Sequence, residues 1–361
     1  MLRACVVVFL LGGATLAAAQ SAAPAPPPDQ KPAAPAAPAP KPVEPPYPRI
    51  TLGVVSYLQY DAELKGRDAY NAFDVTRTYL NVNAALSPRV RFRVTPDIRR
   101  VGDGSLSGSL MFRIKYAFVQ FDDLTPRSWV RFGAHQTPWL DFEESIDRYR
   151  VQGSMFSERE GVVPGSSDFG LGYLTRLPAD RGEINVGVYN GEGYAHAEAG
   201  KHKSVQGRVT VRPFAGPGLA HGLRLSAFYD AGWFAGHRPR RHGIVMASYE
   251  HPRLVTTWQW MGGTERPAPS PADAHLRGQS VFAEVRQGPL GWAVLGRFDR
   301  FTPDHTVADN ADRRLIAGLA RWSAWSSSRV GLVLTDEQVR YDAARRRPDE
   351  HRLLAQVHVQ F

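Results

Sequence analysis

Arginine side chains recur at every second position in several short segments, and their fixed positive charges are the main candidates for chemistry. The clearest segment reads RVRFRVTPD, in which Arg89, Arg91 and Arg93 alternate with Val90 and Phe92. Because side chains one residue apart point to opposite faces of an extended strand, the three guanidinium groups share one face. A row of such groups attracts anions and repels cations, so the spacing predicts a surface that handles anions.

The elements that would hold these arginines are amphipathic segments of about ten residues, separated by connections that alternate between tight and long. Tight connections read SPR, TPRS, ADRG, HP, GPLG and SSSR, and long ones such as ERPAPSPADAHL and TPDHTVADNADR fall between them. About 16 segments follow one another in residues 49–361, an even number that returns both ends to one side. The pattern predicts an all-β fold, a transmembrane antiparallel up-and-down β-barrel. A water-soluble barrel or sandwich is the alternative.

The same alternation gives several segments one cationic and one apolar face. Arginine on the lipid face at mid-bilayer costs about 2–4 kcal/mol, so in a membrane barrel these groups must face the lumen. Some of them could be neutralised by the lumen acids Asp97, Asp230, Glu284 and Asp299. The predicted pore-lining residues are Arg77, Arg91, Arg93, Arg113, Lys115, Arg208, Arg212 and Arg224.

The end of the chain, LLAQVHVQF, is an amphipathic strand closed by Phe361. An open strand edge in lipid leaves backbone groups unsatisfied, so we expect the last strand to pair with the first. Aromatic residues near segment ends are expected to form girdles at the membrane interfaces. They are Phe118, Phe121, Trp129, Trp139, Trp233, Phe234, Trp258, Trp260, Trp322 and Trp325.

The longest connection, residues 138–167, mixes arginines with six carboxylates. A loop of this length in a compact protein is usually functional. It could fold into a wide barrel and narrow the lumen, or it could be an exposed, solvated loop. If it folds inward, the constriction candidates are Arg148, Arg150 and Arg159.

Two segments precede the predicted barrel. Residues 1–19 combine Arg3, an apolar run and a small-residue cleavage site, which predicts a secretory signal peptide. Residues 20–48 are rich in Pro and Ala and predict a disordered periplasmic linker. The only cysteine, Cys5, would leave with the signal peptide. We therefore expect export to the bacterial cell outer membrane.

The segments RFGAHQTPWLDFEESIDRYR, GSSDFGLGYLTRL and INVGVYNGEGY resemble outer-membrane porins of the phosphate-selective porin O/P type. Gly133, Pro138 and Trp139 match that family's strand-to-loop junction, and Phe361 is similar to the aromatic signal that barrel-assembly machinery reads. The resemblance implies a 16-stranded barrel, commonly a homotrimer, with an external loop folded into the pore. The family's lysine cluster has no counterpart, because the only lysines after residue 49 are Lys65, Lys115, Lys201 and Lys203.

Other chemistry finds little support. The chain carries no HExxH, paired cysteines, GxSxG elbow or Gly-rich phosphate loop, so we expect no catalytic residue, no metal and no cofactor. The predicted function is a porin, a water-filled channel for passive diffusion of small hydrophilic solutes with a preference for anions. The alternatives are a structural or adhesive barrel without an open channel, or an outer-membrane hydrolase. Expected partners are small anionic or hydrophilic solutes, outer-membrane lipid, barrel-assembly machinery and further copies of the chain, but no nucleic acid.

Overall fold

The computed structural model describes residues 46–66, 70–102, 104–198, 200–214, 216–234 and 237–361. The predicted signal peptide and almost all of the predicted linker lie outside this part of the chain.

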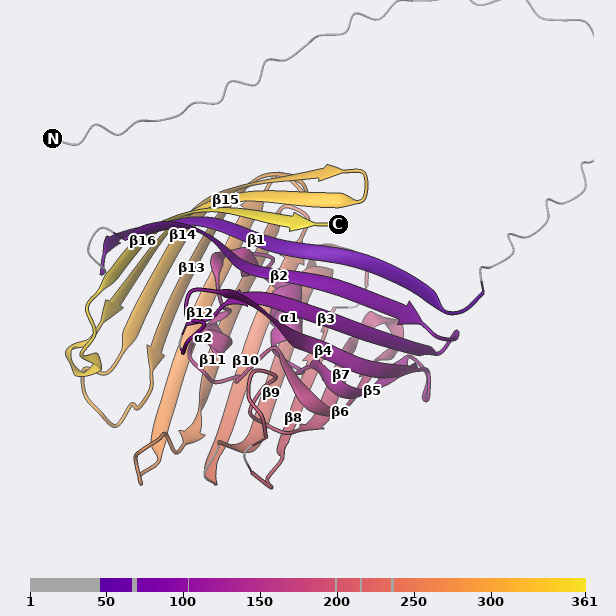
Figure 1. Ribbon diagram of the computed structural model, residues 1–361, viewed down its shortest axis with the longest axis horizontal. Coiled ribbons are helices and arrows are strands. Elements are labelled where there is room, and N and C mark those ends of the chain that lie inside the picture. Colours follow the sequence, from indigo (N-terminus) through magenta and orange to yellow (C-terminus); the bar gives the residue numbers. More distant parts are fainter. Residues whose placement is uncertain (1–45, 67–69, 103, 199, 215, 235–236) are drawn as a thin grey trace, which may run out of the picture. The chain divides into compact units, whose positions relative to one another are not determined.

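Sixteen antiparallel strands form one closed barrel, in which each strand pairs with its neighbours along the chain (Figure 1). This confirms the predicted fold class. The strands are β1 (Arg49–Lys65), β2 (Asn71–Ala85), β3 (Val90–Arg100), β4 (Leu110–Asp122), β5 (Ser128–Gln136), β6 (Ser167–Arg176), β7 (Gly182–Tyr189), β8 (Ser204–Val211), β9 (Leu223–Phe234), β10 (Arg238–His251), β11 (Leu254–Glu265), β12 (Ala274–Arg286), β13 (Gly291–Thr302), β14 (Asp312–Trp325), β15 (Ser328–Tyr341) and β16 (Glu350–Gln360).

The barrel closes where the first and last strands meet. β1 pairs with β16 in a register that places Val55 opposite Gln360. Beyond it, the Val54 N–H donates to the Phe361 carbonyl at 2.9 Å, and the Phe361 N–H donates to the Val54 carbonyl at 3.1 Å. Pairing of the last strand with the first, as the sequence predicts, therefore extends to the terminal residue.

The connections alternate in length as predicted. Short turns join β2 to β3, β4 to β5, β6 to β7, β10 to β11, β12 to β13 and β14 to β15. We call this end of the barrel the short-turn end and the opposite end the long-loop end. The segment AGHRPRR (235–241) reads from the sequence as one of the long loops, and this expectation was wrong for its second half. β10 already begins at Arg238, so the residues through Arg241 belong to the wall.

Polarity is inverted relative to a water-soluble protein. Leu52 and Phe73 are 71% and 84% exposed on the outside, whereas Asp97, Asp230 and Arg240 are buried inside. This arrangement follows the alternation of the sequence, because an apolar exterior suits hydrocarbon and a polar interior suits a water-filled lumen.

β4 changes phase halfway along its length. The register shifts between Thr95 and Pro96, which pair with Tyr116 and Ile114, so Lys115 is the extra residue of a bulge. The extra residue shifts the strand by one position, so the residues that face the lumen change from odd-numbered before the bulge to even-numbered after it. This explains why the alternation of apolar and polar residues reverses within β4.

The aromatic girdle forms only in part. Trp233, Trp258, Trp260 and Trp325 do lie on the outer surface. The expectation was wrong for the buried residues Phe118, Trp129, Trp139 and Trp322. Trp139 and Trp322 belong instead to an apolar cluster inside the barrel.

The helices of the barrel are short. The connection between β5 and β6 contains α1 (Leu140–Ile146), the 3₁₀ turn η1 (Arg150–Gln152) and α2 (Phe156–Arg159). Further 3₁₀ turns are η2 (Pro178–Asp180), η3 (Leu219–Gly222) and η4 (Ala343–Arg345). Among the described residues, no helix has the length and apolar character needed to cross a bilayer.

Replacing Trp139 with alanine should loosen this connection. The indole is fully buried, contacts the rings of Phe142 and Phe228 at 5.9 and 5.6 Å, and donates to Glu143. Loss of a buried Trp side chain costs about 3–5 kcal/mol. We expect limited proteolysis in detergent to cut Trp139→Ala within residues 137–166 several-fold faster than the parent, as an order of magnitude.

Trp325→Ala is the matched control, because this ring is 67% exposed at the β14–β15 turn. Equal cleavage of the two variants would contradict the packing described here.

Candidate functional site

The connection between β5 and β6, residues 137–166, turns back into the barrel, and we call it the inner loop. Its ends are joined where the Thr137 N–H donates to the Ser166 carbonyl at 3.2 Å. Figure 1 shows α1 and α2 within the ring of strands, and their residues Leu140 and Phe156 are fully buried. Of the two possibilities that the sequence left open, the structure has the inward one.

Apolar side chains fix the inner loop to one side of the lumen. Trp139 packs on Phe228 of β9, and the ring of Phe156 lies 6.5 Å from that of Phe301 on β13. A Cβ at Gly278 would lie 2.8 Å from the Phe156 ring, so glycine at this position makes room for the loop. The wall residues of this cluster also include Ile244, Met246, Val255, Met261, Leu276, Phe282, Leu295, Ile316, Trp322 and Val333.

Polar contacts fasten the same loop to the same side. The Arg148 Nε and the Tyr149 hydroxyl donate to Glu284 of β12 at 2.9 and 2.6 Å. Gln152 donates to Glu337 of β15. The inner loop also reaches β16, where Gln356 donates to the Val151 carbonyl at 2.6 Å.

The predicted constriction residues all have carboxylate partners. Arg148 pairs with Glu284, and Arg150 pairs with Glu144 at 3.2 Å and with Glu158. Arg159 pairs with Glu160. The three arginines lie in the inner loop, where their ion pairs hold the loop together and attach it to the wall.

A cavity of about 630 Å³ lies inside the barrel at the short-turn end. It is strongly basic, because five arginines line it and Asp122 is the one carboxylate among its lining residues. The arginines are Arg49, Arg91, Arg93, Arg131 and Arg176.

A second cavity of about 280 Å³ continues from the first and shares Trp129, Arg131 and Arg176 with it. It adds Arg208 and Arg224 from β8 and β9, and the carboxylates Asp141 and Glu183. Together the two cavities are lined by seven arginines and three carboxylates.

Two of these arginines bind only neutral groups with their guanidinium nitrogens. Arg93 donates to the Asn81 amide oxygen at 2.7 Å. Arg131 donates to the amide oxygens of Gln120 and Gln136, both at 2.7 Å. Neutral acceptors orient a guanidinium without cancelling its charge, so both residues keep a full positive charge beside the cavity.

Three predicted lining residues meet on the inner face of β2–β4. Arg77 and Arg113 both donate to Asp97, at 2.7 and 3.0 Å. Lys115 is buried, and its ammonium donates to the Tyr79 hydroxyl at 3.3 Å. Two cations thus share one carboxylate, and the group remains net positive.

The other predicted lining residues divide between the lumen and a turn. Three of these residues form ion pairs in the lumen: Arg91 with Asp122, Arg208 with Glu183 and Arg224 with Glu250. Arg212 lies beyond the end of β8 and donates to the His221 carbonyl at 2.8 Å. The four lumen acids Asp97, Asp230, Glu284 and Asp299 are all buried and all paired with arginines.

Sequence reasoning missed Arg131 and Arg176. Both follow the alternation already used, since Arg131 lies two residues after the inward Trp129 in SWVRFG. The apolar inner face of β10–β15 was missed as well. Its signal was the near-continuous apolar composition of segments such as RLIAGLARW, which is typical of strands buried on both faces.

Two observations concern a metal site and a hydrolase nucleophile. Within them, no group of three His, Cys, Asp or Glu side chains could hold a metal ion. Ser157 is fully buried and donates to Glu143 at 2.9 Å, so it is not placed as an exposed nucleophile.

Glu143 carries the most perturbed carboxyl of the inner loop. Burial raises its pKa from the ordinary 4.5 to about 7, against the opposing effects of Arg297 and of hydrogen bonds from Ser157 and Trp139. Burial also raises the pKa of Glu144 and Asp147. Glu143 is therefore protonated at mildly acidic pH.

A closed barrel of 16 strands, apolar outside and lined by charges within, defines the class of outer-membrane barrels that enclose a lumen.

Comparison with known proteins agrees with this class. No protein-family model and no curated protein sequence matches the chain. Among solved structures, it is similar to an anion-selective porin from Comamonas acidovorans (TM-score 0.62, 13% identity, covering 87% of this chain and 100% of that one). It is also similar to Salmonella typhi OmpF (0.60, 10%, 86% and 97%) and to the outer membrane channel DcaP of Acinetobacter baumannii (0.57, 9%, 87% and 97%). At these identities the likeness concerns the fold, which is that of outer-membrane porins.

The buried Glu143 should make the stability of the barrel depend on pH. A carboxyl whose pKa is raised by folding stabilises the folded state fully below about pH 4.5 and loses that contribution as pH rises to about 7. The melting temperature of the parent relative to Glu143→Gln should therefore fall across this range, equivalent to about 3 kcal/mol at most. Thermal unfolding of both proteins in detergent at several pH values measures this difference, and a constant difference would contradict the raised pKa.

Proposed function

We propose that the protein is an outer-membrane channel for passive diffusion of small hydrophilic solutes, with a preference for anions. The observation that carries this proposal is the lining of the two cavities at the short-turn end, with seven arginines against three carboxylates. A positively lined lumen lowers the electrostatic barrier for anions and raises it for cations.

Charge is distributed unevenly along the lumen. At the long-loop end, a cavity of about 400 Å³ has Arg159, Arg345 and Arg347 opposed by Glu160, Glu265 and Asp312. The positive excess thus lies at the short-turn end, where the two arginine-lined cavities remain open. Discrimination between anions and cations is accordingly expected there.

The solute is proposed to be a general small anion. The resemblance of residues 133–194 to phosphate-selective porins of the O/P type agrees with the inward fold of the inner loop. A dedicated phosphate site receives less support, because Lys115 is the one lysine on an inward-facing strand position and it is buried against Tyr79.

The cellular context is part of the proposal. Residues 1–19 support export as a signal peptide, and the apolar outer surface suits the outer membrane. Phe361 supports recognition by barrel-assembly machinery, since its side chain is 59% exposed at the seam. A homotrimer is also proposed, and one similar barrel, OmpT of Vibrio cholerae, is described in a trimer form.

A structural barrel without an open channel is the second candidate. It is favoured by the apolar cluster that fills the β9–β15 side of the lumen. Single-channel recording in planar bilayers separates the two candidates. The channel proposal expects discrete conductance steps from the purified protein, and an absence of steps from correctly folded barrels would favour the structural one.

Removing the positive charges of Arg93 and Arg131 should weaken the preference for anions. The double variant Arg93→Gln with Arg131→Gln keeps polar side chains but takes two positive charges from the larger cavity. We expect the ratio of chloride to potassium permeability to fall roughly two-fold or more. Reversal potentials in a potassium chloride gradient measure this ratio.

Two matched variants sharpen the test. Asp122→Asn frees Arg91 from its 2.7 Å partner and should shift the ratio in the opposite direction. Arg321→Gln removes a charge from the outer face of β14, next to Trp292, and should leave the ratio unchanged. If the double variant behaved like Arg321→Gln, the arginines would not lie on the path of the ions.

A further inference from the structure

Five arginines of β10–β15 point outward near the long-loop end, against the rule that places arginine in the lumen. Their orientation follows from their neighbours in sequence. Arg314, for example, points inward to Gln152, so Arg313 points out, and Phe301 points inward to Phe156, so Arg300 points out. The outward arginines are Arg241, Arg277, Arg300, Arg313 and Arg340.

Three of them stand side by side on adjacent strands. Arg300 of β13 is the direct cross-strand partner of Arg313 on β14, which is the partner of Arg340 on β15. Like charges directly opposite each other destabilise a sheet. A row of this kind is therefore explained best by an anion that bridges the guanidinium groups.

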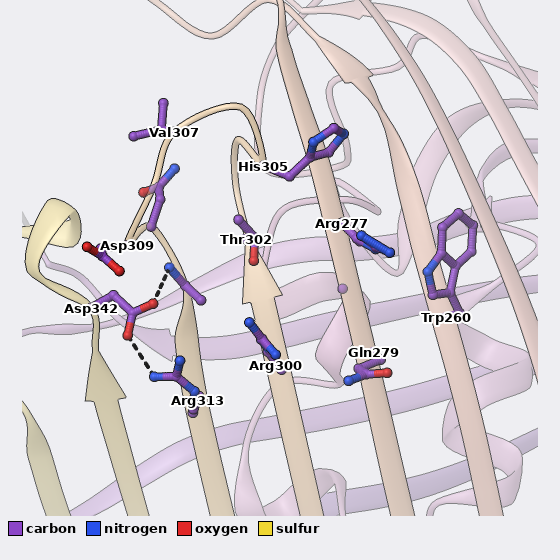
Figure 2. A pocket seen from close by; sticks show the side chains of 13 residues that line it. Trp260, Arg277, Gln279, Arg300, Thr302, His305, Val307, Asp309, Arg313 and Asp342 are labelled. Atoms are coloured by element: carbon purple, nitrogen blue, oxygen red, sulfur yellow. Dashed lines mark hydrogen bonds and ion pairs between the residues drawn. The ribbon is translucent and has the colours of Figure 1, made fainter.

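Two members of the row, Arg300 and Arg313, line a cavity on the outer surface of the barrel with a volume of about 500 Å³. Figure 2 shows Arg277, Arg300 and Arg313 on neighbouring strands, below the connection that carries His305 and Asp309. The cavity is also lined by Trp260, Gln279, Thr302 and Asn310. The lining residues thus offer hydrogen-bond donors on several sides of the cavity.

Two carboxylates, Asp309 and Asp342, line this cavity against three arginines, so the protein neutralises it only in part. Asp342 pairs with Arg313 at 2.7 Å and accepts from the Ala311 N–H at 3.1 Å, so its two oxygens are occupied. Within the described part of the chain, Arg277 and Arg300 make no side-chain hydrogen bond or ion pair. Two guanidinium groups remain available on the outer wall.

An apolar band begins immediately below the cations. Two residues further along each strand, on the same face, Arg300 is followed by Phe298, Arg313 by Leu315 and Gln279 by Val281. All three apolar side chains are exposed. A site with cations above an apolar face matches an amphiphile that has a phosphate above acyl chains.

We propose that this cavity binds the anionic phosphomonoester headgroup of a lipid in the outer leaflet. The phosphate oxygens accept from Arg277, Arg300 and Arg313, and the acyl chains lie along the apolar band of β12–β14. Arginine is tolerated on the lipid face at the membrane interface, where phosphate groups are concentrated. The proposal rests on the proposed membrane location but not on an open channel.

The test is binding of defined lipids to the purified full-length barrel in detergent. Thermal unfolding is followed with added diphosphorylated lipid A, with phosphatidylcholine and with inorganic phosphate. Lipid A should raise the melting temperature at lower concentrations than the other two. The triple variant Arg277→Gln, Arg300→Gln, Arg313→Gln should need about ten-fold more lipid A or more for the same shift.

Arg321→Gln is the matched control, because it removes a charge from the same face of β14 at the short-turn end. A single variant, Arg300→Gln, tests the site if the triple variant does not fold. Equal stabilisation by phosphatidylcholine, whose phosphodiester headgroup carries no net charge, would overturn the proposal, because the arginines would then not select an anionic headgroup. Equal stabilisation by inorganic phosphate would overturn it in favour of a free anion.

Channel conductance keeps this proposal separate from the proposed function. Conductance steps that persist in the triple variant alongside lost lipid A binding are the expected result. Absent conductance steps with intact lipid A binding would count against the channel and leave the lipid site standing. Unchanged lipid A binding by the triple variant would overturn the lipid site and leave the channel standing.

Discussion

The structure depends on one constraint, that a backbone crossing hydrocarbon must find all its hydrogen-bond partners within the protein. An open sheet cannot meet it, and the pairing of β1 with β16, continued by Val54 and Phe361, removes the last free edge. Once the wall is closed, the two faces of every strand have different solvents. The alternation of apolar and polar residues, the inward carboxylates and the exposed Leu and Phe side chains all follow from that difference.

Inside the barrel, a second constraint governs the charges. Burying a carboxylate is costly unless a cation accompanies it, and the acids on the β9–β15 side are accordingly paired with wall or loop arginines such as Arg240, Arg297 and Arg148. Where the inner loop does not reach, water can solvate the side chains and unpaired cations are tolerated. Arg93 and Arg131 lie in that region. The electrostatic character of the lumen is thus decided by which part of the wall the inner loop covers.

The sequence was sufficient for the architecture, because tight and long connections alternate visibly and strand alternation has a fixed period of two. It was also sufficient for inward cations such as Arg77 and Arg113. It failed where the inner loop or a lipid headgroup covers a strand face. Alternation distinguishes the two faces of a strand but does not show what covers each of them. Trp139 and Trp322 were expected at the rims, and they instead hold the inner loop against an apolar inner wall. The outward positions of Arg300 and Arg313 were not predicted for the same reason, because the headgroup layer accepts charged side chains that the hydrocarbon below it excludes.

The tip of the inner loop is tied to the strands that are made last. Gln356 of β16 donates to the Val151 carbonyl at 2.6 Å, and Arg314 of β14 donates to Gln152. A nascent barrel that still lacks its final strand has therefore not yet gained the Gln356 anchor. Closure of the wall and anchoring of the inner loop are completed by the same strand, so the lumen takes its final shape only once β16 is in place.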